Sequence, residues 1–103
     1  MPMFVTLSRF TDQGAKNIRN LRQNVQENMS RGEQLGIKVH GWYLTQGHYD
    51  VVVVAEAPDA ETVLAMAAGV AGTGNARTET LRAYTLDEAE QALQKLGVGQ
   101  SNT

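Results

Sequence analysis

Residues that could take part in chemistry are concentrated around one short glycine turn, Gly47-His48-Tyr49-Asp50. An imidazole such as that of His48 can act as an acid or a base near neutral pH, and Asp50 is a second candidate for proton transfer. We expect aromatic and hydroxyl side chains to complete a pocket for a small apolar or aromatic ligand. The predicted ligand-binding set is Trp42, Tyr43, His48, Tyr49, Asp50, Thr78, Thr80 and Arg82.

Each of these residues also has a purely structural interpretation. Gly47 can make the turn, Tyr49 can pack, and Asp50 can accept hydrogen bonds from turn amides. Arg82 could clamp an anion, because a guanidinium does this well. The interpretation that we favour for Arg82 is an ion pair with a carboxylate across an oligomer interface.

The sequence gives no support for a metal site or a cofactor. Cysteine is absent, so disulfides and thiolate ligands are excluded. His40 and His48 lack the spacing of a ligand set. The glycines at 69, 72 and 74 precede a predicted strand, whereas a phosphate loop leads into the N-terminus of a helix.

Periodicity predicts the elements that hold these residues. Alternating or β-branched runs predict strands, and apolar residues at helical spacing predict helices. The predicted strands are 3–9, 38–46, 50–56 and 77–84. The predicted helices run from Thr11 or Asp12 to Gly32 or Gly36, from Pro58 or Asp59 to Gly72, and over 86–96, followed by a polar tail to residue 103.

This order, βαββαβ followed by a C-terminal helix, predicts a single α+β domain of ferredoxin-like fold, with a four-stranded antiparallel sheet and helices on one face. The other face then needs a cover. We expect Phe4, Trp42 or Tyr43, and part of the valine run 51–54 on this open face. If Leu81 and Ala83 point at the helices, then Thr78, Thr80 and Arg82 also lie on the open face.

An uncovered apolar sheet face predicts self-association, and a second copy about a twofold axis is the simplest cover.

A net charge of -2 shows none of the basic character that nucleic-acid binding requires. The longest apolar stretch is too short to span a membrane, and the N-terminus lacks the pattern of a signal peptide. Together with the absence of cysteine, this favours the cytoplasm.

Several blocks of the sequence resemble the GYD-domain family of small bacterial proteins. The turn and strand at 47–52, the helix entry at 56–59, the opening helix at 11–18 and the last strand at 77–84 carry the resemblance. The family is similar to dimeric α/β-barrel proteins, in which two ferredoxin-like sheets face each other. The resemblance therefore implies a dimeric α/β-barrel assembly, and it transfers no catalytic residue.

The resemblance directs attention to the residues of these motif blocks, namely Gly47, Tyr49, Asp50, Thr78, Glu79 and Arg82. His48 stands at what looks like the variable place of the motif, which argues against a catalytic base there. Three functions stay open. The chain is an oligomeric small-molecule-binding protein, a cofactor-independent oxygenase or isomerase, or a purely structural self-assembly module.

Overall fold

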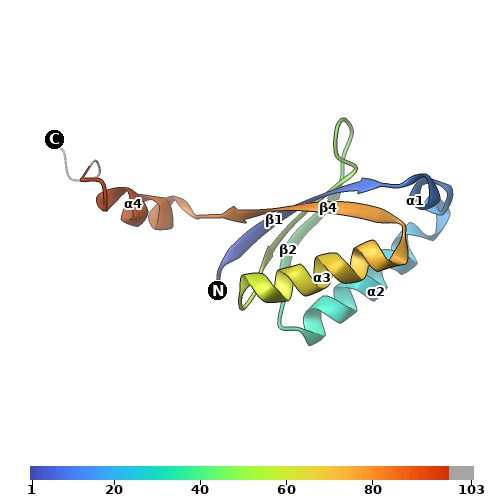
Figure 1. Ribbon diagram of the computed structural model, residues 1–103, viewed down its shortest axis with the longest axis horizontal. Helices are drawn as coiled ribbons and strands as arrows, with labels where there is room; N and C mark the ends of the chain where they lie inside the picture. Colours follow the sequence, from blue (N-terminus) through green and yellow to red (C-terminus); the bar gives the residue numbers. More distant parts are fainter. Residues whose placement is uncertain (98–103) are drawn as a thin grey trace.

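The structure, a computed structural model, describes residues 1–97 and is built on one antiparallel sheet (Figure 1). Its strands are β1 (Met3–Phe10), β2 (Lys38–Leu44), β3 (Val51–Glu56) and β4 (Ala76–Ala83), in the spatial order β2-β3-β1-β4. This is the ferredoxin-like arrangement, so the predicted fold class is confirmed. The predicted polar tail, apart from Gly97, lies outside the described residues.

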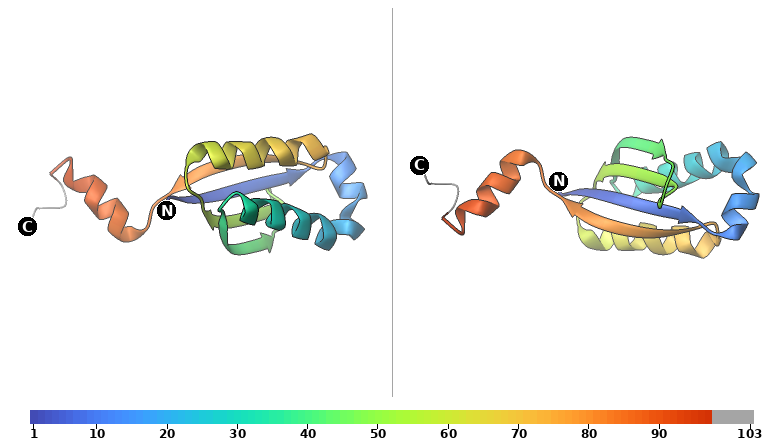
Figure 2. Two further views of the ribbon diagram at one scale, coloured as in Figure 1. Left: turned by 90° about the horizontal axis from the view of Figure 1, so that it is seen from below. Right: turned by 90° about the horizontal axis from the view of Figure 1, so that it is seen from above.

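The helices are α1 (Asp12–Lys16), the 3-10 helix η1 (Ile18–Asn20), α2 (Leu21–Gln34), α3 (Ala60–Thr73) and α4 (Leu86–Gln94). Helices α2 and α3 lie side by side under one face of the sheet (Figures 1 and 2). The Asp59 side chain caps α3 by accepting a hydrogen bond from the Thr62 amide at 2.8 Å. Gly74 ends α3 in the left-handed conformation, with φ of 80°.

The first helical segment is not the single long helix that we predicted. It is divided at Asn17 because α1 is fixed to the turn between α3 and β4. The Thr11 amide donates to the Asn75 carbonyl at 3.0 Å, and the Asn17 side chain donates to the Asn75 side chain at 3.2 Å. Only glycine fits at position 14, since a Cβ there would stand 1.9 Å from the Asn75 carbonyl oxygen.

The strand register corrects the predicted assignment of side chains to the two faces. Phe4, Thr6 and Ser8 of β1 stand opposite Arg82, Thr80 and Thr78 of β4. Alternate residues of a strand share a face, so these six residues point to one side. That side is the one under the helices, because Phe4, Thr78 and Thr80 line the same space as residues of α2 and α3.

The prediction that Phe4, Thr78, Thr80 and Arg82 lie on the open face was therefore wrong. For the three residues of β4 it rested on the apolar pair Leu81 and Ala83, which we expected to face the helices. The polarity pattern of an edge strand with mixed residues is a weak guide to which of its faces meets the helices. A shift of the pairing register by one residue would move every side chain of the strand to the other face. The register with β1, whose Phe4, Thr6 and Ser8 face the helices, sets the orientation of β4, and Leu81 is 44% exposed on the open face.

The last helix does not pack on the sheet. We name residues 84–97, which contain α4, the arm, and the arm projects beyond the end of the sheet (Figures 1 and 2). The radius of gyration is 16.3 Å, with a longest extent of 55 Å, whereas a compact domain of this length has a radius of about 13 Å. Within residues 1–97 of one copy, this helix therefore packs on no other helix or strand.

Replacing Gly14 tests the close approach of α1 to the α3–β4 turn. Gly14→Ala is expected to lower the free energy of unfolding by about 1–3 kcal/mol, because the backbone at Asn75 must move. The matched control is Gly72→Ala in α3, where an added Cβ meets nothing within 4 Å. The control should be neutral or stabilising by up to about 1 kcal/mol. Urea unfolding of both variants measures the difference, and equal values would contradict the predicted clash.

Candidate functional site

The open face of the sheet has an apolar centre. We define it by Val5 and Leu7 of β1, Val52 and Val54 of β3, and Leu81 of β4, which follow one another across the strand register. Tyr43 of β2 stands opposite Val52. The Tyr43 ring lies over Gly41, where a Cβ would stand 2.7 Å from the ring, so the aromatic ring lies flat against this face.

A polar cluster lies at one end of the open face, where the loop between β2 and β3 rises on the side opposite the helices (Figure 1). We define the cluster by Arg9, His48, Tyr49 and Glu79. Arg9 is 2.7 Å from Nδ1 of His48, and the Tyr49 hydroxyl donates to the Glu79 carboxylate at 2.8 Å. The Arg9 guanidinium also lies 5.3 Å from the centre of the Tyr49 ring.

This geometry restricts what His48 can do. A guanidinium only donates hydrogen bonds, so Nδ1 of His48 is the acceptor in its contact with Arg9. Since His48 is exposed and does not line the cavity under the sheet, it faces solvent rather than an enclosed reaction site.

Asp50 has a structural role in this arrangement. Its carboxylate accepts a hydrogen bond from the Phe10 amide at 2.8 Å, at the end of β1. Its backbone amide donates to the Ser8 carbonyl, and its carbonyl accepts from the Thr45 amide, both at 2.8 Å. Asp50 thus joins the hairpin loop to the central strand β1. The structural interpretation expected its carboxylate to accept from turn amides, whereas it accepts from the Phe10 amide, 40 residues away in the chain.

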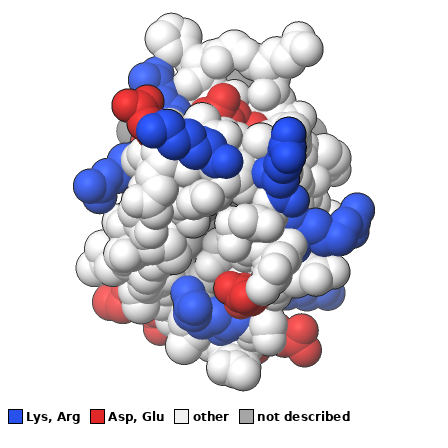
Figure 3. All heavy atoms as spheres, turned by 90° about the vertical axis from the view of Figure 1, so that its right-hand side faces the viewer, with Lys and Arg blue, Asp and Glu red and all other residues white. Residues whose placement is uncertain are grey.

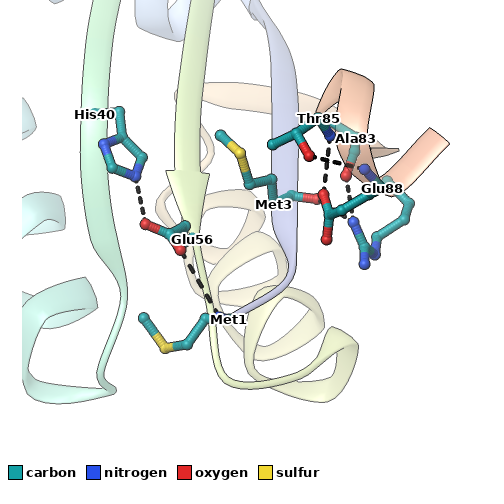
Figure 4. Close-up of polar contacts among 8 residues, drawn as sticks. Met1, Met3, His40, Glu56, Ala83, Thr85 and Glu88 are labelled. Carbon is teal, nitrogen blue, oxygen red and sulfur yellow. Dashed lines mark hydrogen bonds and ion pairs between the residues drawn. The ribbon is translucent and has the colours of Figure 1, made fainter. Parts of the chain in front are cut away.

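The opposite end of the open face carries a second polar group (Figure 4). His40 and Glu56 are 2.6 Å apart, and the N-terminal ammonium lies 3.8 Å from Glu56. The hydrogen bond with His40 lowers the pKa of Glu56. The open face therefore has an apolar centre between two polar ends, which is the anatomy of a protein interface.

Arg82 holds the beginning of the arm. Its guanidinium donates to the backbone carbonyls of Met3 and Ala83 and lies 4.2 Å from the centre of the Tyr84 ring. The capping box that follows, between Thr85 and Glu88, fixes the start of α4 (Figure 4). The sequence analysis favoured a carboxylate across an oligomer interface as the partner of Arg82. Within one copy, Arg82 instead contacts these two carbonyls and the Tyr84 ring.

The predicted ligand-binding residues do not meet at one place. Trp42, Thr78 and Thr80 line a cavity between the sheet and the helices, whereas His48 and Tyr49 belong to the polar cluster on the other face. The sequence analysis missed Thr6 and Ser8, which also line this cavity. Their alternation with Val5 and Leu7 indicates that the two pairs lie on opposite faces of β1, but it does not indicate which pair faces the helices.

The distribution of charged side chains and of possible metal ligands does not point to a further binding site in the described part of the chain. At the end of the molecule that carries α1, basic and acidic side chains are interspersed among uncharged ones (Figure 3). Within residues 1–97, no group of three or more histidine or acidic side chains is arranged to hold a metal ion. No helix of that part of the chain is long and apolar enough to cross a bilayer.

Comparison with known proteins gives one family and one named relative. The family model of the GYD domain matches residues 4–93. The chain is 37% identical over 84 residues to a protein of Thermus thermophilus named glutamine synthetase and cystathionine beta-lyase binding protein. The matched segment covers 81% of this chain and 88% of that relative. No solved structure gives a significant match.

The Tyr49–Glu79 hydrogen bond makes a prediction about pH. Chiefly through this bond, Glu79 raises the pKa of Tyr49 above the ordinary value of 10.0, while Arg9 opposes the shift. The stability that comes from the neutral phenol is present below its unfolded-state pKa and is lost as the pH rises through the higher folded-state pKa. Glu79→Gln should therefore lower the pKa of Tyr49, measured by NMR of the ring carbon that bears the hydroxyl.

The control for this titration is Glu90→Gln, which removes a carboxylate from α4 and should leave Tyr49 unchanged. The chain has three tyrosines, so Tyr43 and Tyr84 serve as internal references. A Tyr49 titration that is identical in Glu79→Gln and the native chain would contradict the predicted role of the bond.

Proposed function

The chain belongs to the GYD-domain family, and we propose that it is a homo-oligomeric binding protein that attaches to other proteins and carries out no reaction itself. The observation that carries this proposal is that two apolar surfaces, the open face and the arm, have no partner within residues 1–97. The name of the Thermus thermophilus relative, a binding protein for two enzymes, supports the same class of function.

The open face is proposed to pair with the same face of a second copy. Its centre is made of Val5, Leu7, Val52, Val54 and Leu81, which a monomer would leave in water. A twofold contact is self-complementary, so each copy covers the other with one kind of surface. Tyr43 would contribute aromatic contact area, and His48 and Tyr49 of the polar cluster would lie at the rim. The assembly is then the dimeric α/β barrel expected from the family resemblance.

The arm is proposed to bind a groove of the partner enzyme. Leu86, Ala89 and Leu93 recur at positions i, i+3 and i+7 and form one stripe on α4, and Leu96 follows in the turn after the helix. Leu86 and Leu96 are both 76% exposed. An amphipathic helix that presents such a stripe binds apolar grooves in other proteins. The acidic residues Asp87, Glu88 and Glu90 suit a groove with basic residues along its rim.

Several contacts favour binding over catalysis. Nδ1 of His48 faces a guanidinium, and one carboxylate oxygen of Asp50 is used by the Phe10 amide. The candidate acid–base groups of an oxygenase or isomerase are therefore engaged in holding the hairpin loop. A small-molecule site beside Tyr43 and Tyr49 on the open face would compete with the proposed dimer contact for the same surface.

The proposed place of action is the bacterial cytoplasm. Enzymes of amino-acid metabolism, such as the two in the relative's name, are the proposed class of partner. The absence of cysteine from the chain suits a reducing compartment.

Sedimentation velocity tests the proposed dimer. Native protein should sediment as a dimer or a larger assembly at micromolar concentration. Leu81→Glu, which places a carboxylate on the open face, should shift it toward monomer by weakening association at least about 10-fold. The control is Leu64→Glu on α3, at a leucine that is 69% exposed. A monomeric native protein, or equal effects of the two substitutions, would overturn the proposed dimer contact.

Surface plasmon resonance with purified glutamine synthetase and cystathionine beta-lyase of the same organism tests the partner. Leu93→Glu is expected to weaken binding to the immobilised enzyme at least about 10-fold, because it interrupts the apolar stripe at its middle. Gln91→Glu adds the same side chain on the opposite side of α4 and should bind as the native chain does. Absence of binding to both enzymes would contradict the proposed partner class, even if the dimer is confirmed.

A further inference from the structure

A cavity separates the sheet from its helices. Its volume is about 230 Å³, and it lies on the face of the sheet opposite to the open face. The wall on the sheet side includes Phe4, Trp42 and Val53, and the wall on the helix side includes Val63 and Met66. This space is partly open to solvent. Because the layers of a protein normally pack with few voids larger than a water molecule, a hollow of this size between the sheet and the helices of a small domain requires an explanation.

A row of hydroxyl groups lines part of this mostly apolar space. Thr6 stands opposite Thr80, and Ser8 stands opposite Thr78, on the adjacent strands β1 and β4. All four line the cavity. Valine has nearly the same shape as threonine and is used in β3 just beside them, so four hydroxyls at these positions are a chemical feature rather than a packing necessity.

Ser8 is the most informative of the four residues. It is only 8% exposed, its backbone carbonyl accepts from the Asp50 amide, and none of the side-chain hydrogen bonds found within residues 1–97 involves its hydroxyl. A buried polar group without a partner is costly, and most such groups in native proteins are satisfied. A ligand that brings one polar group into the cavity would satisfy the Ser8 hydroxyl.

We propose that this cavity binds a small, mostly apolar ring compound that carries one hydroxyl group. The ring would contact the Phe4, Trp42 and Met66 side chains, and its hydroxyl would lie within hydrogen-bond reach of Ser8 and Thr78. This site is on the other side of the sheet from the proposed dimer contact, and it does not depend on the proposed protein-binding function.

The volume sets the size of the ligand. An engineered apolar cavity of roughly 150 Å³ holds one benzene molecule. A cavity of about 230 Å³ therefore suits a single ring with a short substituent, on the order of nine or ten non-hydrogen atoms. A substituted phenol meets both the size and the need for one polar group that can donate and accept.

Isothermal titration calorimetry with 4-ethylphenol and ethylbenzene tests the site on the full-length protein. The two probes differ only in the hydroxyl. The native chain should bind both and prefer 4-ethylphenol. Ser8→Ala should weaken binding of 4-ethylphenol by about 3- to 10-fold, the value of one hydrogen bond, and should leave ethylbenzene unaffected. This loss of selectivity would not result from a general loosening of the fold.

A second pair of variants tests where the probes bind. Ala67 of α3 lines the cavity, whereas its exposed neighbour Ala68 does not. Ala67→Leu fills the space and should abolish binding of both probes, while Ala68→Leu should bind them as the native chain does. Circular dichroism checks that both variants are folded. If Ala67→Leu does not fold, the selectivity of Ser8→Ala still tests the site.

Three results would overturn the proposal. The first is that neither probe binds the folded native protein at millimolar concentration. The second is that folded Ala67→Leu binds as well as Ala68→Leu, which would place the probes elsewhere. The third is that the probes bind only when the chain is shortened after Thr85, which would mean that the arm of another copy occupies the cavity.

Discussion

The structure of this protein depends on a mismatch between a sheet with two faces and helices that cover only one of them. Helices α2 and α3 lie under one face (Figure 1), and the opposite face presents Leu7, Val52 and Val54, which no helix within residues 1–97 covers. Among residues 1–97, the buried apolar residues are few, namely Phe4, Val51, Ala57 and Ala76. A small domain with so limited a core would gain stability from contacts beyond a single copy, which is why the proposed assembly follows from the fold.

The residues of the glycine turn illustrate how side chains that resemble catalytic groups can serve structure. Asp50 joins the hairpin loop to β1 through the Phe10 amide, and Tyr49 reaches across the sheet to Glu79. Arg9 completes this set by contacting both His48 and the Tyr49 ring. These contacts hold the loop above the open face, so the motif lies at the edge of the surface that we propose as an interface. Its polar atoms are engaged by neighbouring groups instead of being directed into a pocket.

The two sides of the sheet have different chemistry because side chains alternate along each strand. Trp42 faces the cavity with its hydroxyl-lined wall, and Tyr43, the next residue, lies on the open face over Gly41. A surface for another protein and a site for a small molecule can therefore occupy the same short strands without sharing side chains. The projecting arm adds a third surface, and its orientation follows from Arg82 and the capping box at Thr85.

The sequence by itself determined the element order, the ferredoxin-like class and the family, because β-branched runs, helical spacing and turn residues are local signals. It also indicated Asp50 as a turn residue from its type and position. It did not determine which face of β4 meets the helices, since Thr78, Thr80, Leu81 and Ala83 alternate on an edge strand without a clear apolar side. Pairing with β1 made that choice. The break at Asn17, the cavity beside Ser8 and the isolated arm likewise arise from contacts, or missing contacts, between segments far apart in the chain, and only the tertiary structure brings such segments together.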